Sequence, residues 1–217
     1  MSWVITGIQQ YPAVIGEPFG GGYFAGYISH TADGNPTHAL IVAPRETGAT
    51  GTSYTLTTNL AWKTANTATA GTTSDFDGVA NTAAMVTAGI ADHPAAKFCV
   101  DLSIGGFTDW YLPSRYELDI AYFNLKPGTQ ANNTSWGIND YSVPKRTINN
   151  TVAYPAQTSV TAFSTSSEAF IASEHWSSTA NVASSNIGWW ISFASGLLGQ
   201  NAKTAGYRVR AFRRIAL

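Results

Sequence analysis

Apolar residues cluster near both ends of the chain, which predicts that the strands of the fold come from both ends. Residues 23–28 and 38–44 are mostly apolar, and the turn-forming sequence of residues 33–36, Asp-Gly-Asn-Pro, separates them. This order predicts a β-hairpin whose first strand is buried on both faces. The glycines at 20–22 lack the helix and the Lys-Ser/Thr pair of a phosphate-binding loop, so we interpret them as a bend or bulge.

The C-terminal part predicts a β-meander. Its expected strands are residues 175–179, 188–193, 197–202 and 206–215. We expect the last segment to close the meander, with Tyr207 and Val209 on one face and Arg208 and Arg210 on the other.

Two helices are predicted between the hairpin and the middle of the chain. The first covers residues 77–89, with Asp75 or Asp77 as its cap and Val79, Ala83 and Val86 at helical spacing. The second covers residues 92–100, with Asp92 as N-cap and Pro94 in the first turn. A capping or surface role is expected for His93, because no second ligand lies at metal spacing.

The segment from Gly106 to Leu125 carries the clearest helix signal. Ser114 and Glu117 have the spacing of a capping box, and Leu118, Tyr122 and Leu125 follow at helical intervals. The sequence Lys-Pro-Gly at 126–128 ends the helix. A short strand containing Trp110 is expected to lead directly into it.

Residues 128–170, which we call the excursion, combine almost no charge with many Asn, Thr, Ser and aromatic residues. A segment this long without a clear period is typical of a functional loop. If it binds a ligand, the expected contact residues are Trp136, Asn139, Tyr141 and Tyr154. The alternative is that their rings pin the excursion to the sheet or to a neighbouring subunit.

The composition narrows the classes of function. Charged residues make up 12% of the 217 residues and the net charge is −1, so no basic surface is available for nucleic acid. Cys99 is the only cysteine, which excludes an intramolecular disulfide and a thiolate cluster and predicts a small buried side chain. The first residues contain neither a basic leader nor an apolar run of membrane-spanning length, so we expect synthesis in a cytoplasm and no membrane insertion. A shortened chain would explain the same observation.

Three pieces in this order resemble the C-terminal domain of the Legionella collagen-like adhesin, a family that recurs in bacterial surface proteins and phage proteins. They are Gly-Phe-Thr-Asp-Trp-Tyr-Leu-Pro-Ser-Arg-Tyr-Glu-Leu at 106–118, His-Trp-Ser-Ser-Thr at 175–179, and Tyr-Arg-Val-Arg-Ala-Phe-Arg-Arg at 207–214. Residues 20–28 and 39–44 are similar to the opening strands of its longer members. Tyr111 and His175 depart from the family pattern, which has Arg and Tyr there.

The resemblance implies an α+β, C-type-lectin-like fold: two helices flanking a twisted antiparallel sheet, with a long irregular excursion. The chain would then divide into an N-terminal arm, residues 1–13, and one domain, residues 14–217. The residues in the shared motifs are expected to hold the fold rather than a ligand. They are Asp109, Trp110, Arg115, Glu117, Trp176, Arg210 and Arg213. We expect an Arg of the last strand to pair with a carboxylate beside Trp110, and Asp109→Ala to cost roughly 2–4 kcal/mol.

The sequence favours binding over catalysis. No nucleophile motif places a serine beside a histidine, and one cysteine cannot form the cysteine pair of the formylglycine-generating enzymes, which share this type of fold. Calcium would need clustered oxygen ligands, and Asn139-Asp140 is the only faint candidate. We therefore expect no catalytic residue, no metal and no cofactor.

The leading hypothesis is a phage virion surface protein, in a tail or fibre tip, that recognises a host glycan or envelope protein without catalysis. The alternative is a capsid or tail decoration protein with a structural role, and a glycan-degrading enzyme is a more remote third. Other virion proteins are the expected partners. Because few charges cover the surface and the arm at Trp3 and Ile5 is apolar, we also expect a homo-oligomer, with a trimer favoured.

Overall fold

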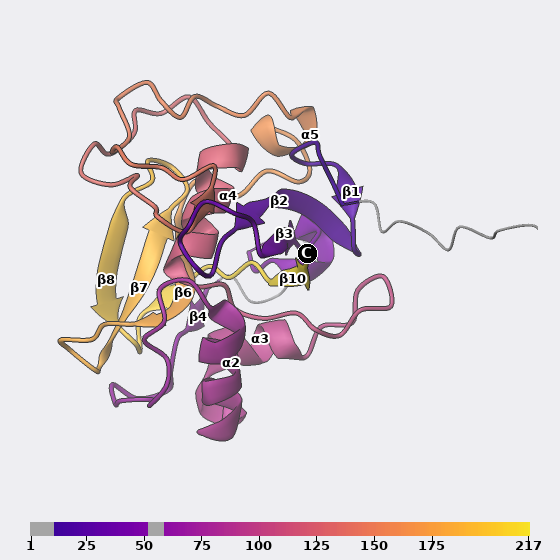
Figure 1. The fold of residues 1–217 in the computed structure, drawn as a ribbon. Helices are drawn as coiled ribbons and strands as arrows, with labels where there is room; N and C mark the ends of the chain where they lie inside the picture. The colour runs from indigo at the N-terminus through magenta and orange to yellow at the C-terminus, as the bar shows by residue number, and fades with distance from the viewer. Residues whose placement is uncertain (1–10, 52–58) are drawn as a thin grey trace, which may run out of the picture.

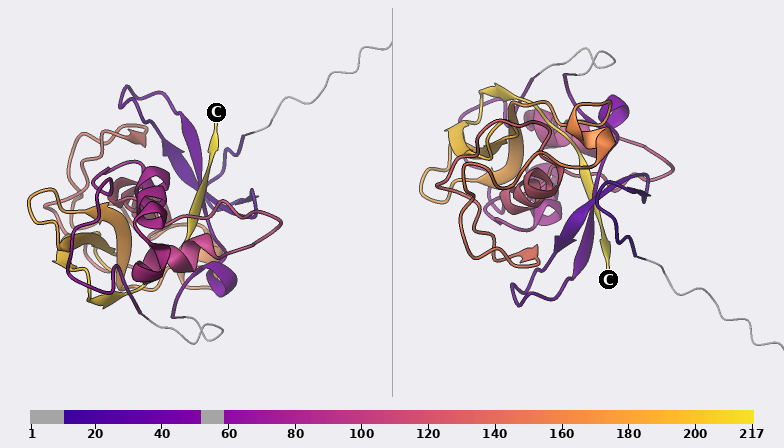
Figure 2. Two further views of the ribbon diagram at one scale, coloured as in Figure 1. Left: turned by 90° about the horizontal axis from the view of Figure 1, so that it is seen from below. Right: turned by 90° about the horizontal axis from the view of Figure 1, so that it is seen from above.

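The computed structural model describes residues 11–51 and 59–217, so the apolar arm expected at Trp3 and Ile5 lies outside the described residues. Helix α4 (Arg115–Leu125) lies between two antiparallel sheets, while α2 (Gly78–Thr87) and α3 (Pro94–Val100) pack below them and the excursion runs above (Figure 1). The view from above shows the same position of α4 between the two sheets (Figure 2, right). The fold is α+β.

The first sheet joins the two ends of the chain. Its strands run in the order β1 (Pro18–Phe19), β2 (Gly22–Ile28), β3 (His38–Val42) and β10 (Phe212–Ala216), and β5 (Ser142–Val143) pairs with the far end of β2. The predicted hairpin is confirmed by the antiparallel pairing of β2 with β3, which shifts register between Phe24 and Gly26. Gly20 and Gly21 have positive φ values, 57° and 84°, so the expected bend needs residues without a Cβ.

The second sheet is the predicted meander, but without its closing strand. It contains β6 (Glu174–Ala180), β7 (Ile187–Ser192) and β8 (Leu198–Ala202). The next segment divides between β9 (Gly206–Tyr207), which pairs with β4 (Leu60–Ala61), and β10 in the first sheet. Expecting this segment to close the meander was wrong.

The physical reason lies in the residues between β9 and β10. Val209, Arg210 and Ala211 are all buried, so they do not alternate between a buried and a solvent-facing side. Their backbone bonds instead to residues 43–50: the carbonyls of Val209 and Ala211 accept from Thr50 and Ala43, and Ala211 N–H donates to Gly48. These bonds carry the chain from one sheet to the other.

Helix α2 begins as predicted, with the Asp77 side chain accepting from Ala80 N–H at 2.9 Å. Its buried face differs from the one expected. Val79 and Val86 are exposed, whereas Asn81, Thr82 and Met85 are buried. Asn81 and Thr82 turn inward because they hydrogen-bond Ser178 and the backbone of residues 74 and 112.

The second predicted helix starts one residue late. Asp92 belongs to a 3₁₀ turn, η1 (Ile90–Asp92), and His93 occupies the N-cap position of α3. Expecting His93 at the surface was wrong, because it is fully buried. One ring nitrogen hydrogen-bonds Thr69 Oγ1 at 2.9 Å and the other donates to the Gly89 carbonyl at 2.8 Å. Cys99 is a buried free cysteine, as expected.

The capping box of α4 is confirmed. Ser114 Oγ accepts from Glu117 N–H, and the Glu117 carboxylate accepts from Ser114 N–H at 2.7 Å. The expected strand before it reduces to one bridge, in which Tyr111 exchanges two backbone hydrogen bonds with Phe212. Trp110 itself is in no strand, because only Tyr111 meets β10.

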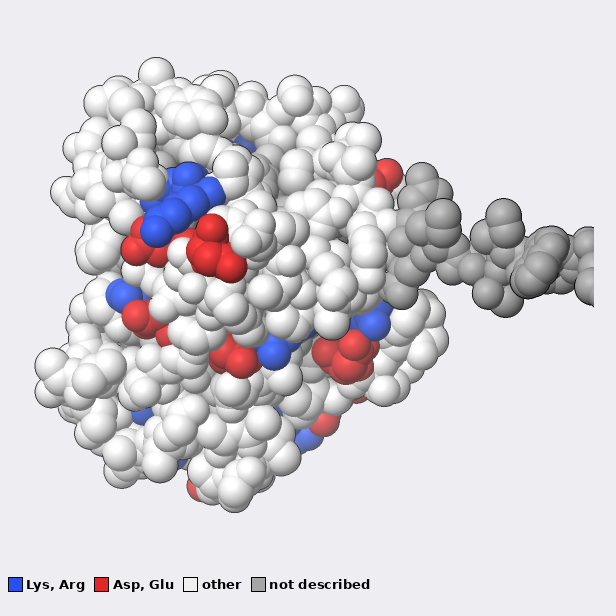
Figure 3. Space-filling view, in the orientation of Figure 1, with Lys and Arg blue, Asp and Glu red and all other residues white. Residues whose placement is uncertain are grey.

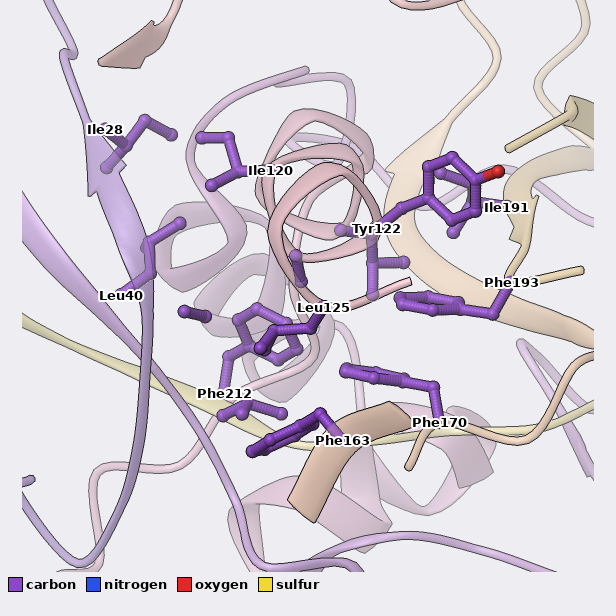
Figure 4. Close-up of a cluster of buried hydrophobic side chains, with 14 of the residues drawn as sticks. Ile28, Leu40, Ile120, Tyr122, Leu125, Phe163, Phe170, Ile191, Phe193 and Phe212 are labelled. Atoms are coloured by element: carbon purple, nitrogen blue, oxygen red, sulfur yellow. The ribbon is translucent and has the colours of Figure 1, made fainter. Parts of the chain in front are cut away.

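The apolar core surrounds α4 on both sides (Figure 4). Ile120, Tyr122 and Leu125 of α4 lie between two groups of side chains. From the first sheet come Ile28, Leu40 and Phe212, and from the other side Phe163, Phe170, Ile191 and Phe193. A second cluster, which includes Trp62, Trp110 and Trp176, fills the space near α2 and α3. Two short helices, α1 (Arg45–Gly48) and α5 (Thr161–Ser164), complete the helices among the described residues.

Candidate functional site

The excursion leaves α4 through a buried lysine. Lys126 Nζ donates to the carbonyls of Gln130 and Pro155, at 2.6 and 3.2 Å, and to Asn132 Oδ1 at 2.7 Å. The Asn132 amide donates in turn to the Pro155 carbonyl at 3.0 Å, and Tyr122 of α4 donates to Asn132 Oδ1. These bonds hold both ends of the segment 130–155 against the helix.

A second anchor lies in the middle of the excursion. Arg146 pairs with Asp119 of α4, and the Asn139 amide donates to the same carboxylate oxygen, Oδ2, at 2.7 Å. Both charged side chains are buried: Asp119 is 2% exposed and Arg146 10%. Burial lowers the pKa of Arg146 to about 10, so it stays charged near neutral pH.

This anchor corrects one expected contact residue. Asn139 is fully buried, its amide nitrogen donates to Asp119 and to the Tyr116 carbonyl, and its side-chain oxygen accepts from Tyr141 N–H. Since its polar groups all serve the fold, Asn139 presents nothing to an external ligand in this structure.

The other expected contact residues reach the surface. Tyr141 stacks on Phe76, with ring centroids 4.3 Å apart, and its other neighbour is Tyr116 at 5.6 Å. Trp136 meets Trp189 of β7 edge to face at 6.1 Å. Tyr141 and Trp136 are half-buried, so each ring both packs on the domain and keeps part of its surface open.

Arg115 connects these rings. Its guanidinium lies 4.6 Å from the Trp189 ring and 4.9 Å from the Tyr116 ring, and it pairs with Asp75 at 2.7 Å. The row of side chains from Phe76 to Trp136, which we call the aromatic ladder, therefore joins the excursion to α4 and β7. Its members are Phe76, Tyr141, Tyr116, Arg115, Trp189 and Trp136.

Tyr154 lies at a different place, on the rim of a cavity of about 320 Å³ between α4 and residues 142–154. Phe123 and Asn124 of α4 form one wall, and residues from Ser142 to Thr151 form the rest. Tyr154 is 58% exposed and meets Phe123 edge to face at 5.3 Å. Ile148, on the same rim, is 75% exposed.

A comparison with protein-family models matches residues 51–213 to the family described as the Lcl C-terminal domain. The match covers three quarters of the chain. The chain belongs to this family. No curated protein matches it. Membership favours an adhesin-like, surface-binding role, and the resemblance seen in the three sequence pieces is confirmed.

The motif residues of this Lcl C-terminal domain lie inside the fold or at its edges. Arg213 makes a two-bond pair with Asp109, at 2.8 and 2.9 Å, and its guanidinium lies 3.7 Å from the Phe107 ring. This is the pairing expected beside Trp110. Asp109, however, is 55% exposed on its side chain, so the pair is only half-buried and its cost of removal is smaller than a buried pair would give.

The remaining motif residues are buried, except Arg115 of the aromatic ladder, whose side chain is 16% exposed. Trp176 is fully buried and donates from its indole to the Leu60 carbonyl at 2.9 Å. Arg210 donates to the Ala43 carbonyl and pairs with Glu168 at 3.0 Å, which holds the end of the excursion to the last segment of the chain. Glu117 accepts from Ser114, Gly78 and Tyr111, and burial raises its pKa to about 7.

The surface carries few charges, and many of them lie in ion pairs. On the face shown in Figure 3, most red and blue side chains lie beside one another in a band across the middle, and a few more lie near the lower edge. Within the described residues, no group of three His, Cys, Asp or Glu side chains could hold a metal ion. No helix of residues 11–51 or 59–217 has the length and apolar character to cross a membrane.

Sequence reasoning missed two residues that shape this region. Asp119 lies between apolar residues in the sequence of α4, and this position could have indicated a buried carboxylate that needs a partner. Arg146 gave no signal, because its pairing depends on how the excursion folds back over the helix. It is the fold that brings Arg146 and Asp119, 27 positions apart, into contact.

Proposed function

We propose that this domain is a non-catalytic binding head and that the excursion is its contact surface, with Trp136, Tyr141 and Tyr154 as the main contacts. One observation supports this above all. The excursion is fixed to α4 by buried polar groups, yet it leaves large apolar side chains at the surface, namely Ile138, Ile148, Val152 and Tyr154. A fixed segment loses little conformational entropy on binding.

We propose further that the fold is C-type-lectin-like. Family membership and the central helix between antiparallel strands support this assignment. Three helices of seven or more residues, α2, α3 and α4, would then stand where the resemblance implied two.

The working place that we propose is the surface of a phage virion, in a tail or fibre tip that contacts a host glycan or envelope protein. The resemblance to phage proteins and the low charge support this proposal. The alternative is a capsid or tail decoration protein among other virion proteins, in which case the exposed apolar side chains would cover subunit contacts. Finding the chain at a capsid-lattice position on an intact particle would favour decoration.

We also propose self-association, with a trimer favoured. Exposed aliphatic residues outside the excursion, including Val14 and Leu217 at 63% and 42%, support burial against further copies. Light scattering of the full chain at micromolar concentration measures the mass directly. A monomeric mass would contradict this part of the proposal.

The binding proposal is tested with Trp136→Ala and Tyr141→Ala, measured for melting temperature and for adsorption to intact bacterial cells from a strain panel. Val182→Ala, an exposed apolar residue in the β6–β7 loop, is the matched control. We expect each ladder variant to reduce adsorption of the folded protein about tenfold or more, since Trp and Tyr truncation at a contact centre costs about 2 kcal/mol. Normal adsorption of both variants would show that the two rings stabilise the fold and do not bind the ligand. No adsorption of the unaltered chain to any strain would overturn the proposal.

A further inference from the structure

We infer that the cavity between α4 and residues 142–154 binds one or two rings of a neutral saccharide. This inference rests on the proposed binding function and names the ligand class. The aromatic ladder is a separate surface, so the cavity is a second, enclosed part of the contact region. Its volume of about 320 Å³ lies at the lower end of the range of small-molecule sites, about 300–1,000 Å³, and suits a short saccharide.

The walls of the cavity alternate between apolar surface and hydrogen-bonding groups. Phe123, Ile148 and Tyr154 supply apolar surface, and amide and hydroxyl side chains separate them. Those polar residues are Asn124, Thr147, Asn149, Asn150 and Thr151. A pyranose ring has the matching chemistry, because its C–H faces stack on aromatic rings while its hydroxyls bond to amides. A purely apolar ligand would leave the amide groups unpaired.

Buried N–H groups at the cavity wall lack acceptors. Asn150 is 7% exposed, and its amide nitrogen has no hydrogen-bond partner among the described residues. The same holds for Nε and Nη1 of Arg146. A buried donor without an acceptor is costly. Because each of these nitrogens has almost no accessible surface, a sugar hydroxyl would accept from one only after the wall side chains shift.

The position of Asn150 is fixed independently of any ligand. The backbone N–H of Asn150 donates to the Trp136 carbonyl at 2.7 Å. Gly137 approaches so closely that a Cβ on it would lie 2.4 Å from this backbone nitrogen. Gly137 has a φ of 130°, which also excludes a side chain. The backbone of Asn150 is therefore held at the cavity wall.

Charge in the cavity favours a neutral ligand over an anion. Its two basic residues already have partners: Arg146 pairs with Asp119, and Lys145 pairs with Asp140 at 3.0 Å. Two positive and two negative groups cancel, so an anion would lose its hydration in a mostly apolar cavity without a net attraction in return.

The experiment uses the full chain and methyl glycosides of glucose, galactose, mannose, N-acetylglucosamine and rhamnose, with glucuronic and N-acetylneuraminic acid as anionic comparators. Saturation-transfer NMR and titration measure binding. Two variants alter the rim without touching the buried anchors: Asn149→Trp fills the opening, and Tyr154→Ala removes the exposed ring. Val182→Ala is again the matched control.

We expect at least one neutral glycoside to bind the unaltered chain and the control equally, and both rim variants to weaken it tenfold or more with unchanged melting temperatures. Preference for the acidic sugars, binding that survives Asn149→Trp, or no binding of any glycoside would each overturn the inference. Cell adsorption separates this result from the broader proposal. If adsorption is lost in the ladder variants but survives Asn149→Trp, the proposed binding function holds and the cavity takes no part in it.

Discussion

The sheets with α4 and the excursion are stabilised by different interactions. Between the sheets, α4 is surrounded by apolar side chains such as Leu40, Phe193 and Phe212. Residues 130–155 of the excursion cross the same helix and are held by Lys126, Asp119 and their partners, whereas Phe163 and Phe170 at its end join the apolar core. Apolar packing is non-directional, whereas hydrogen bonds and ion pairs fix one geometry. An irregular segment can therefore be held in one conformation without a regular secondary structure.

Two neighbouring residues of α4 test this difference most strongly. Asp119→Ala leaves the buried Arg146 charge without its carboxylate, so we expect the free energy of unfolding to fall by about 3–5 kcal/mol. Leu118→Ala removes core packing and should cost about 2–5 kcal/mol. Urea unfolding measures both.

Limited proteolysis distinguishes the two variants. Only Asp119→Ala should open cleavage sites between residues 140 and 152 under native conditions, because only that change releases the excursion. Asp101→Ala, which removes an exposed pair with Lys97, should cost about 0.5 kcal/mol or less. Equal proteolysis of the Asp119→Ala and Leu118→Ala proteins would contradict the division between the two regions.

Glu117 is a polar exception inside the region of apolar packing. Glu117→Ala leaves Ser114 N–H, Gly78 N–H and the Tyr111 hydroxyl without their acceptor, so we expect a loss of about 3 kcal/mol. Glu117→Gln keeps one acceptor oxygen for the two N–H groups and turns an NH₂ donor toward the Tyr111 hydroxyl, and it cannot ionise.

The pH dependence separates these two effects. Burial raises the pKa of Glu117 from 4.5 to about 7, so the folded chain binds an extra proton between these values. The contribution of Glu117 to the stability therefore declines as the pH rises from about 4.5 to 7. Relative to the unaltered protein, Glu117→Gln should gain stability over this interval in urea titrations. A constant difference between pH 5 and pH 8 would refute the assigned pKa.

Two histidines, His175, which is buried, and His30, which is half-buried, act in the opposite direction. Burial lowers the pKa of His175 from 6.5 to about 3 and, with help from Arg214, that of His30 to about 4. The unfolded chain then binds more protons than the folded chain below about pH 6.5, so the stability falls on acidification. We expect a slope approaching about 1.4 kcal/mol per pH unit for each histidine.

His175→Phe should lower this slope by the contribution of one histidine. The Phe ring should fit in the same place, since Phe170 and Phe193 already surround the His175 ring. The check is the pH dependence of the urea midpoint between pH 4 and pH 6.5. A slope unchanged in the variant would show that His175 does not titrate in this range.

Asp109→Ala is expected to have a smaller effect than Asp119→Ala or Glu117→Ala. Its pair with Arg213 is half-exposed, so Asp109→Ala should cost about 1–2 kcal/mol rather than the roughly 2–4 kcal/mol expected from sequence. Adsorption of the folded variant should be normal. Selective loss of adsorption without a change in the unfolding midpoint would show that Asp109 belongs to the binding surface and does not stabilise the fold.

The sequence alone determined the elements with local signals. The hairpin of β2 and β3, the capped start of α2, the capping box of α4 and the meander strands all follow from turn residues, caps and alternation within a few positions. The Lcl C-terminal domain family could also be recognised this way, because its motifs are contiguous in the chain.

Only the tertiary structure decided which surfaces meet. Nothing near residues 206–215 indicates that β10 leaves the meander to pair with β3, or that α2 buries Asn81 and Thr82 instead of Val79 and Val86. Asn139 has the composition of a contact residue, and only the approach of Asp119 and Tyr116 shows that its amide is already bonded. The physical reason is common to all three cases. Burial and hydrogen-bond partners depend on contacts between distant segments, and a local pattern of residue types does not specify those contacts.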